Sequence, residues 1–201
     1  MKSLKNKALI LLCISWFPLV TCSTLKKGIL HPPQSAIIQE KSEDIRITEY
    51  VIDNIKSEKV LSFYDSLTGS RKITIAILQN AREWNVPINF AFALAKKESE
   101  FNPHCENYNE WNDSWDRGLF QLNDKSFVLT EEEYFNPDIN AHKGLQYFHQ
   151  QLLTFGDTYL AMLAYNWGPN RVKAGRTPPK KVVDYIEDIK NYEKEYNYLF
   201  F

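Results

Sequence analysis

The run Phe90–Ala95 constrains the fold of this chain more than any other feature. All six of its residues are apolar, so a helix over this segment has no polar side to turn toward water and must be buried all round. Pro87 precedes the run, and Pro103 stops any continuation of the helix. The run therefore predicts a central helix whose last turn, Lys96–Ser99, carries polar side chains out of the core.

Apolar residues at helical spacing predict further helices around this one, over residues 70–84, 140–155, 159–165 and 182–196. Ser70 and Asn140 are the expected N-caps of the first two. No segment has a convincing alternating pattern, so the predicted class is all-α, with a small hairpin within 104–118 left open. We expect one folded domain over residues 69–201, preceded at 23–68 by a linker and a short helical extension.

Composition narrows the class of protein. The chain has 201 residues, 44% of them hydrophobic, which excludes a largely disordered polypeptide. Its formal net charge of −1 argues against a dedicated nucleic-acid binder, which needs a basic face. The four histidines lack the close spacing of a metal site. We therefore expect no metal, no cofactor and no nucleic-acid partner, and we expect a monomer.

Residues 1–22 are interpreted as an export signal. Three lysines precede the 13-residue apolar run Ala8–Val20, which is too short to span a bilayer but suits a signal sequence. A buried N-terminal helix is the alternative. The sequence Leu19–Cys22 resembles a bacterial lipoprotein cleavage box, although Thr21 departs from the small residue usual there. Cys22 is thus a lipidation candidate and the one expected membrane attachment, with plain secretion equally open. Either route predicts a periplasmic or cell-envelope location.

Glu98 is the candidate catalytic carboxylate. It lies in the last turn of the predicted buried helix, where the negative end of the helix dipole and the loss of water both raise a carboxyl pKa. A carboxyl group that stays protonated near neutral pH can act as a general acid. Position alone also allows Glu98 to reach solvent or to pair with Lys97.

Four sequence blocks occur in an order that resembles the soluble lytic transglycosylase family, lysozyme-like muramidases that cut peptidoglycan. The blocks are Glu98–Pro103, Asn112–Asn123, Phe135–Asn140 with Gly144, and Ala164–Pro169. The resemblance extends from about Ser70 to Tyr185 and implies a lysozyme-like helical domain over 69–201. It departs from the family pattern at Arg117 and in the long stretch 104–113, which carries Trp111.

This resemblance implies a role for particular residues. Glu98 falls on the catalytic acid of the family, and the implied substrate-binding positions are Ser114, Gln121, Tyr165, Asn166 and Trp167. Trp167 can stack on a sugar ring or pack in the interior. Asp116 matches a position that is mainly structural in the family. Gly118 and Gly168 fit tight turns, where a side chain would be strained.

The implied reaction is cleavage of the β-1,4 bond between N-acetylmuramic acid and N-acetylglucosamine in peptidoglycan glycan strands. Glu98, as the single catalytic carboxyl, protonates the leaving oxygen and then deprotonates the muramic acid 6-hydroxyl, which gives a 1,6-anhydro product. A hydrolytic muramidase has the same acid but admits water. A non-catalytic glycan-binding envelope module is the other alternative.

Overall fold

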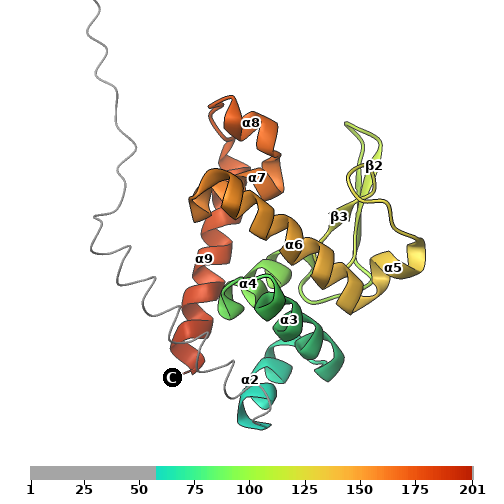
Figure 1. The fold of residues 1–201 in the computed structure, drawn as a ribbon, viewed down its shortest axis with the longest axis vertical. Helices are drawn as coiled ribbons and strands as arrows, with labels where there is room; N and C mark the ends of the chain where they lie inside the picture. The colour runs from blue at the N-terminus through green and yellow to red at the C-terminus, as the bar shows by residue number, and fades with distance from the viewer. Residues whose placement is uncertain (1–57, 201) are drawn as a thin grey trace, which may run out of the picture.

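The computed structural model describes residues 58–200 (Figure 1). The predicted export signal, Cys22 and the linker lie outside these residues. The helices are α2 (Glu58–Thr68), α3 (Arg71–Glu83), α4 (Ile88–Ser99), α5 (Glu131–Phe135), α6 (Pro137–Phe155), α7 (Thr158–Trp167), α8 (Pro169–Lys173) and α9 (Lys180–Phe200). None of the helices in this described part is both long and apolar enough to cross a membrane.

Helix α4 is the centre of the core, as its sequence predicts. Phe92, Ala93 and Ala95 are each 0% exposed. Helix α9 packs along α4, and α3 packs against α4 from another side (Figure 1). The predicted apolar face of α9 is confirmed, because its four marker residues are all buried: Val182, Ile186, Ile189 and Tyr196.

Helix α2, the last part of the predicted N-terminal extension, packs directly on this core. Val60 and Tyr64 are buried, and the Tyr64 ring stacks on Phe92 with centroids 4.2 Å apart. The Tyr64 hydroxyl donates a hydrogen bond to Asn89 Oδ1 at 2.8 Å. This bond satisfies the polar end of a side chain that is otherwise enclosed by apolar atoms.

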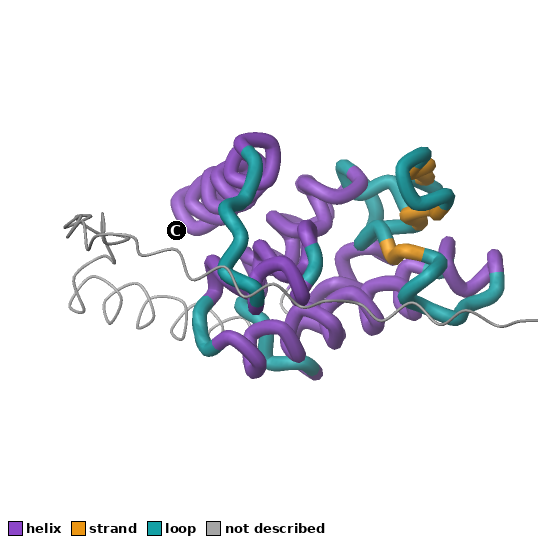
Figure 2. The backbone as a smooth tube through the Cα atoms, turned by 90° about the horizontal axis from the view of Figure 1, so that it is seen from above, coloured by secondary structure: helices purple, strands orange, loops and turns teal. Residues whose placement is uncertain are grey.

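A three-stranded antiparallel sheet corrects the all-α prediction. Strands β1 (Glu106–Asn109), β2 (Ser114–Arg117) and β3 (Leu122–Asn123) lie in that order. Figure 2 shows them gathered at one end of the molecule. The first two form the hairpin that the sequence left open. Most of their side chains are polar and at least partly exposed, so no apolar alternation marks them as strands.

The predicted cap of α6 is also wrong. The helix begins at Pro137, and the Asn136 side chain accepts hydrogen bonds from the backbone N–H of Asp138 at 3.0 Å and of Ile139 at 3.3 Å. Proline is favoured at the first helical position, so Asn136–Pro137 was the true start signal. Asn140 lies one turn inside the helix and is fully buried. Ser70 does occupy the N-cap of α3, but its side chain makes no capping bond.

Candidate active site

Glu98 lies in the final turn of α4, and backbone geometry ends the helix directly after it. Glu100 and Phe101 adopt the left-handed conformation, with φ of 53° and 66°. The Ser99 hydroxyl donates to the backbone oxygen of Leu119 at 2.8 Å. This bond joins the end of α4 to the segment that follows β2. The acidic side chain is thereby held where the helical core meets the sheet.

Tyr185 of α9 is the direct partner of Glu98. Its hydroxyl donates a short hydrogen bond to Glu98 Oε1, and its side chain is only 8% exposed. The neighbouring Lys97 pairs with Asp188, with Nζ and Oδ2 2.6 Å apart. The helical side of the site therefore supplies Glu98 with a neutral donor.

Burial raises the pKa of Glu98 from 4.5 to about 8. The negative charge of Asp116 acts in the same direction, while the Tyr185 hydrogen bond and the positive charge of Lys97 lower the pKa by less. The loss of water disfavours the ionised form of Glu98. This effect is larger than the combined stabilisation of that form by the Tyr185 hydrogen bond and the partly exposed Lys97. The carboxyl group is therefore mostly protonated at neutral pH, which is the form that a general acid requires.

Tyr165 of α7 lies close enough to Glu98 for the two groups to interact electrostatically. Burial, and then the charge of Glu98, raise the pKa of the Tyr165 hydroxyl well above its ordinary value. This neutral hydroxyl donates to the backbone oxygen of Phe120 at 2.9 Å. Asn140 Oδ1 accepts from the Phe120 backbone N–H at 2.7 Å. Both peptide groups of Phe120 are thus fixed between α6 and α7.

The sheet side of the site is a network of amides around Asp116. The two Asp116 oxygens accept hydrogen bonds from Asn109 Nδ2 at 2.8 Å and from Asn123 Nδ2 at 2.7 Å. The fully buried Ser114 hydroxyl accepts from Asn123 at 2.8 Å and donates to Asn112 Oδ1 at 2.8 Å. Asp116 is therefore bound within the sheet, in agreement with the structural role that the resemblance implied.

The Gln121 amide is engaged at both ends. Its Oε1 accepts from Asn107 at 2.6 Å, and its Nε2 donates to the backbone oxygens of Gly118 at 2.9 Å and Cys105 at 3.0 Å. Cys105 in turn lies within electrostatic reach of Glu98. Gln121 thus lines the same region through its neighbours, and a direct contact with substrate stays a prediction.

Asn166 and Trp167 end α7. The Asn166 side chain is exposed, and Trp167 is partly buried against the core. Both glycines that were expected at tight turns have positive φ, 80° at Gly118 and 98° at Gly168. A Cβ at Gly118 would lie 2.2 Å from the Tyr134 backbone oxygen, so no side chain fits there.

The sequence prediction missed Tyr185. It lies on the buried face of α9, beside Val182 and Ile186, and therefore looks like an ordinary core residue. A usable signal existed, because a buried tyrosine hydroxyl normally needs a hydrogen-bond partner. Sequence spacing does not reveal which partner that is, since Glu98 lies 87 residues earlier in the chain.

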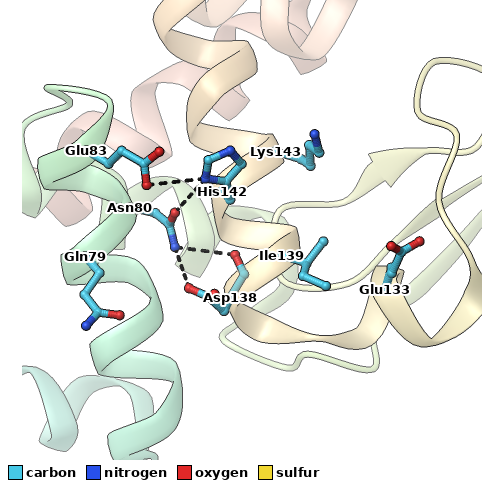
Figure 3. Close-up of a pocket in the computed structure, with 8 residues that line it drawn as sticks. All are labelled: Gln79, Asn80, Glu83, Glu133, Asp138, Ile139, His142 and Lys143. Carbon is cyan, nitrogen blue, oxygen red and sulfur yellow. Dashed lines mark hydrogen bonds and ion pairs between the residues drawn. The ribbon is translucent and has the colours of Figure 1, made fainter.

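A separate pocket of about 550 Å³ lies beside α3 and α6 (Figure 3). The eight lining residues in the figure include neither Glu98 nor any predicted substrate-binding residue. Several of the polar groups bond to one another: Asn80 Nδ2 donates to Asp138 Oδ1 at 2.9 Å, and His142 Nδ1 lies 3.1 Å from Asn80 Oδ1. Within residues 58–200, no group of three or more His, Cys, Asp or Glu side chains could hold a metal ion.

The fold and the site define a small helical domain with one minor sheet, in which the Glu98 carboxyl group lies where the two meet. The chain belongs to the transglycosylase SLT domain family, whose domain model matches residues 75–183. This match confirms the family that the four sequence blocks predicted.

The chain is also similar in sequence to two curated proteins and in fold to a solved structure. The chain is 31% identical to protein IpgF of Shigella flexneri over 115 residues, which make up 53% of this chain and 70% of IpgF. The IpgF protein of Shigella sonnei gives the same values. An inactive mutant of the lytic transglycosylase Slt from Pseudomonas aeruginosa has the same fold, with a TM-score of 0.50 and 21% identity. That likeness covers 61% of this chain but only 23% of the Slt chain.

Proposed function

We propose that this protein is a peptidoglycan lytic transglycosylase that cleaves the β-1,4 bond between N-acetylmuramic acid and N-acetylglucosamine. The observation that carries the proposal is the environment of Glu98. Its carboxyl group has a pKa of about 8 and lies in a domain of a transglycosylase family. A reaction that begins with protonation of a leaving oxygen needs such a group.

Glu98 performs both proton transfers in this scheme. Tyr185 occupies Glu98 Oε1, so we assign the acidic proton to Oε2. That proton passes to the glycosidic oxygen as the bond to the anomeric carbon breaks, and N-acetylglucosamine leaves with a free hydroxyl. The resulting carboxylate then takes the proton of the muramic acid 6-hydroxyl. The 6-oxygen bonds to the anomeric carbon, which gives the 1,6-anhydro product and restores the acid.

The Tyr185 hydroxyl supports the second half of this cycle. After the first transfer Glu98 is ionised, and a hydrogen bond to a carboxylate is stronger than one to a neutral acid. The donor therefore stabilises the charged intermediate state more than the resting state. The substrate N-acetyl group would stabilise the positive charge that develops at the anomeric carbon, as in substrate-assisted glycosidases.

A hydrolytic muramidase is the second candidate, and the state of Asp116 argues against it. Most glycosidases that admit water use a second carboxylate as nucleophile or base. Asp116 is the carboxylate whose charge acts on Glu98, and its two oxygens already accept hydrogen bonds from Asn109 and Asn123. A glycan-binding module without activity has no use for a buried acid that keeps its proton at neutral pH.

Mass spectrometry of the fragments released from purified peptidoglycan tests the proposal. The wild-type protein should release 1,6-anhydro-muropeptides, and Glu98→Gln should release none while keeping the same fold. Glu133→Gln is the matched control, because it makes the same change on α5, away from the predicted substrate-binding residues. This variant should cut normally. Products with reducing ends would assign the protein to the hydrolases. No release by the wild type would leave glycan binding as the function.

The expected export signal is consistent with this substrate, which lies outside the cytoplasmic membrane. We therefore also propose that the protein acts in the periplasm or cell envelope, with Cys22 as the candidate lipid attachment site. Fractionation of cells that express the full chain and a Cys22→Ala variant tests this part. Loss of the variant from the membrane fraction would support lipidation, and equal distribution of the two proteins would favour plain secretion.

A further inference from the structure

Arg171 of α8 lies between two tryptophans from distant parts of the chain. Its guanidinium carbon is 5.6 Å from the centroid of the Trp111 ring and 5.8 Å from that of Trp167. Trp111 belongs to the turn between β1 and β2, whereas Trp167 ends α7. The arginine therefore connects the sheet to the helical part of the domain through cation–π contacts.

A hydrogen bond to the backbone also holds the Arg171 guanidinium in place. Arg171 Nη1 donates to the Trp167 backbone oxygen at 2.5 Å. Gly168 has a φ of 98°, which lets the chain turn sharply from α7 into α8 and brings Arg171 under the end of α7. The orientation of the guanidinium is thus fixed by the backbone as well as by the two rings.

No carboxylate of residues 58–200 forms an ion pair with Arg171. Lys97, Arg117 and Lys180, by comparison, each pair with an acidic side chain. A guanidinium has five N–H donors arranged to bind a carboxylate through two parallel hydrogen bonds. One of these donors is used by the Trp167 backbone. A positioned cation with donors to spare is suited to an anionic ligand.

Trp111 is an exposed aromatic residue on a braced turn. Its side chain is 73% exposed. The turn around it is fixed by the Tyr108 hydroxyl, which donates to Asp113 Oδ1 at 2.8 Å, and by the Ser114 hydroxyl bonded to Asn112. A large apolar ring held in water by a rigid turn is typical of a surface that contacts a ligand.

These three residues belong to the two segments that flank Glu98. Trp167 follows Tyr165 on α7, and Trp111 precedes the strand that carries Asp116. Tyr165 and Asp116 both interact electrostatically with Glu98. Arg171 therefore lies between the end of the helix that carries Tyr165 and the turn before the strand that carries Asp116.

We propose that Arg171, framed by Trp111 and Trp167, binds a carboxylate of the peptide stem that is attached to muramic acid. The stem carries free carboxylates, whereas the alternating sugars of a glycan without stems carry only the acid of the lactyl ether. Arg171 then makes the protein selective for glycan that carries stems. This inference rests on the proposed function, because it takes peptidoglycan as the ligand.

Binding measurements on an inactive background separate this inference from the proposed function. Glu98→Gln protein is mixed with insoluble peptidoglycan, or with the same material after an amidase has removed the stems, and the bound fraction is titrated. Adding Arg171→Gln should weaken binding to intact peptidoglycan by about tenfold, since a charge-assisted pair is lost. The stripped glycan keeps only the lactyl carboxylate, which lies beside the sugar ring and not at the end of a peptide, so its binding should change by less than about twofold, within the range of a distant surface substitution.

Arg176→Gln is the matched control, because Arg176 is an exposed residue just after α8 and the substitution removes the same charge. It should leave both affinities unchanged. Arg171→Lys keeps the cation but loses the planar fork, and it carries the test if Arg171→Gln does not fold by circular dichroism. We expect it to reduce the preference for intact peptidoglycan by about threefold.

An equal loss of affinity for both polymers, or no loss for either, would overturn the stem-binding role of Arg171. It would leave the lytic function untouched, because the release of anhydro products by the wild type is measured separately. Failure of the Glu98→Gln parent to bind intact peptidoglycan would also overturn the proposal. The salt dependence of the affinity difference between the parent and Arg171→Gln is a further readout. An arginine that only stabilises the turn would give a difference that does not depend on salt.

Discussion

The helical side and the sheet side of the site each hold one carboxyl group, Glu98 and Asp116, in contrasting surroundings. On the helical side, Glu98 is only partly exposed at the end of α4, and burial raises its pKa to about 8, so the carboxyl keeps its proton. On the sheet side, both oxygens of Asp116 already accept hydrogen bonds from the amides of Asn109 and Asn123, so this carboxyl group is held within a polar network. The comparison shows that the surroundings of a carboxyl group, and not its residue type, decide whether it can act as the general acid.

The same contrast extends to how the two sides are stabilised. The helical side is a close-packed core in which Phe92, Leu94 and Ile189 have at most 1% exposure. The sheet contributes few buried side chains and depends on hydrogen bonds among Asn, Asp, Ser and Gln. Hydrophobic burial tolerates small shifts, whereas each bond of a polar network has a narrow geometry. We therefore expect the sheet side to be the more sensitive to small changes.

Gly118→Ala tests that sensitivity and should have the largest effect. The added methyl group would lie 2.2 Å from the Tyr134 oxygen and 2.3 Å from Asn140 Nδ2, at a φ of 80°. We expect the free energy of unfolding to fall by about 4 kcal/mol, because strain and a broken network add. Denaturant unfolding measures this value.

Gly156→Ala is the matched control for this substitution. Its φ of 64° is similarly left-handed, but a Cβ there meets nothing within 4 Å. The cost should be about 1 kcal/mol from backbone strain alone. Equal losses in the two variants would show that the junction of the sheet with α6 is not tightly packed.

Glu98→Gln should stabilise the protein at high pH. The folded protein holds the Glu98 proton to about pH 8, whereas an ordinary glutamate loses it near 4.5. The folded state therefore binds more protons between these values, so the stability of the wild type falls as the pH rises through this window. A neutral amide avoids this loss. We expect a gain of about 2 kcal/mol at pH 9, after allowance for partial exposure of the side chain to solvent.

Thermal unfolding of both proteins at pH 4 and pH 9 measures the gain. The difference should be close to zero at pH 4, where both states of the wild type hold the proton. A gain of the same size at both pH values would point to packing and not to the buried charge.

Tyr185→Phe should move the alkaline limit of activity. The hydroxyl lowers the pKa of Glu98 by donating to its carboxylate, so its removal raises that pKa. Because Glu98 must be protonated to act as the acid, we expect the alkaline limb of the pH–rate profile to move to higher pH by about one pH unit. Tyr134→Phe is the control, because that hydroxyl donates to the Phe127 backbone and not to Glu98. A shift in the other direction would contradict the assigned role of Tyr185.

Lys97→Gln should have the smallest effect. It removes the pair with Asp188, whose partners are 30% and 47% exposed. We expect a loss of about 0.5 kcal/mol, since pairs in contact with solvent contribute little. Lys180→Gln removes a more exposed pair with Asp184 and should cost less. Chemical denaturation of both variants in low and high salt measures these losses. The electrostatic contribution of each ion pair should shrink in high salt, because salt screens exposed charges.

The helical side was largely predictable from sequence, and the sheet side was not. An apolar run between two prolines predicts a buried helix with Glu98 in its last turn, since burial leaves a periodic trace. The strands leave no such trace, because their residues Glu106, Asn107 and Trp115 all face solvent. The Glu98–Tyr185 bond links residues far apart in sequence, and periodicity carries no information about such pairs. The cap of α6 was wrongly predicted at Asn140 because two asparagines lie four residues apart, and only Asn136, which directly precedes Pro137, caps the helix.

The position of Tyr185 on α9 has a consequence for the order in which the site is assembled. Glu98 enters the growing chain 87 residues before its hydrogen-bond partner. Until α9 docks against α4, the carboxyl lacks the Tyr185 donor and the cover that α9 provides. The environment of the general acid is therefore incomplete until this last helix of the chain is in place. A cut within α9 would switch the chemistry off while leaving Glu98 itself intact.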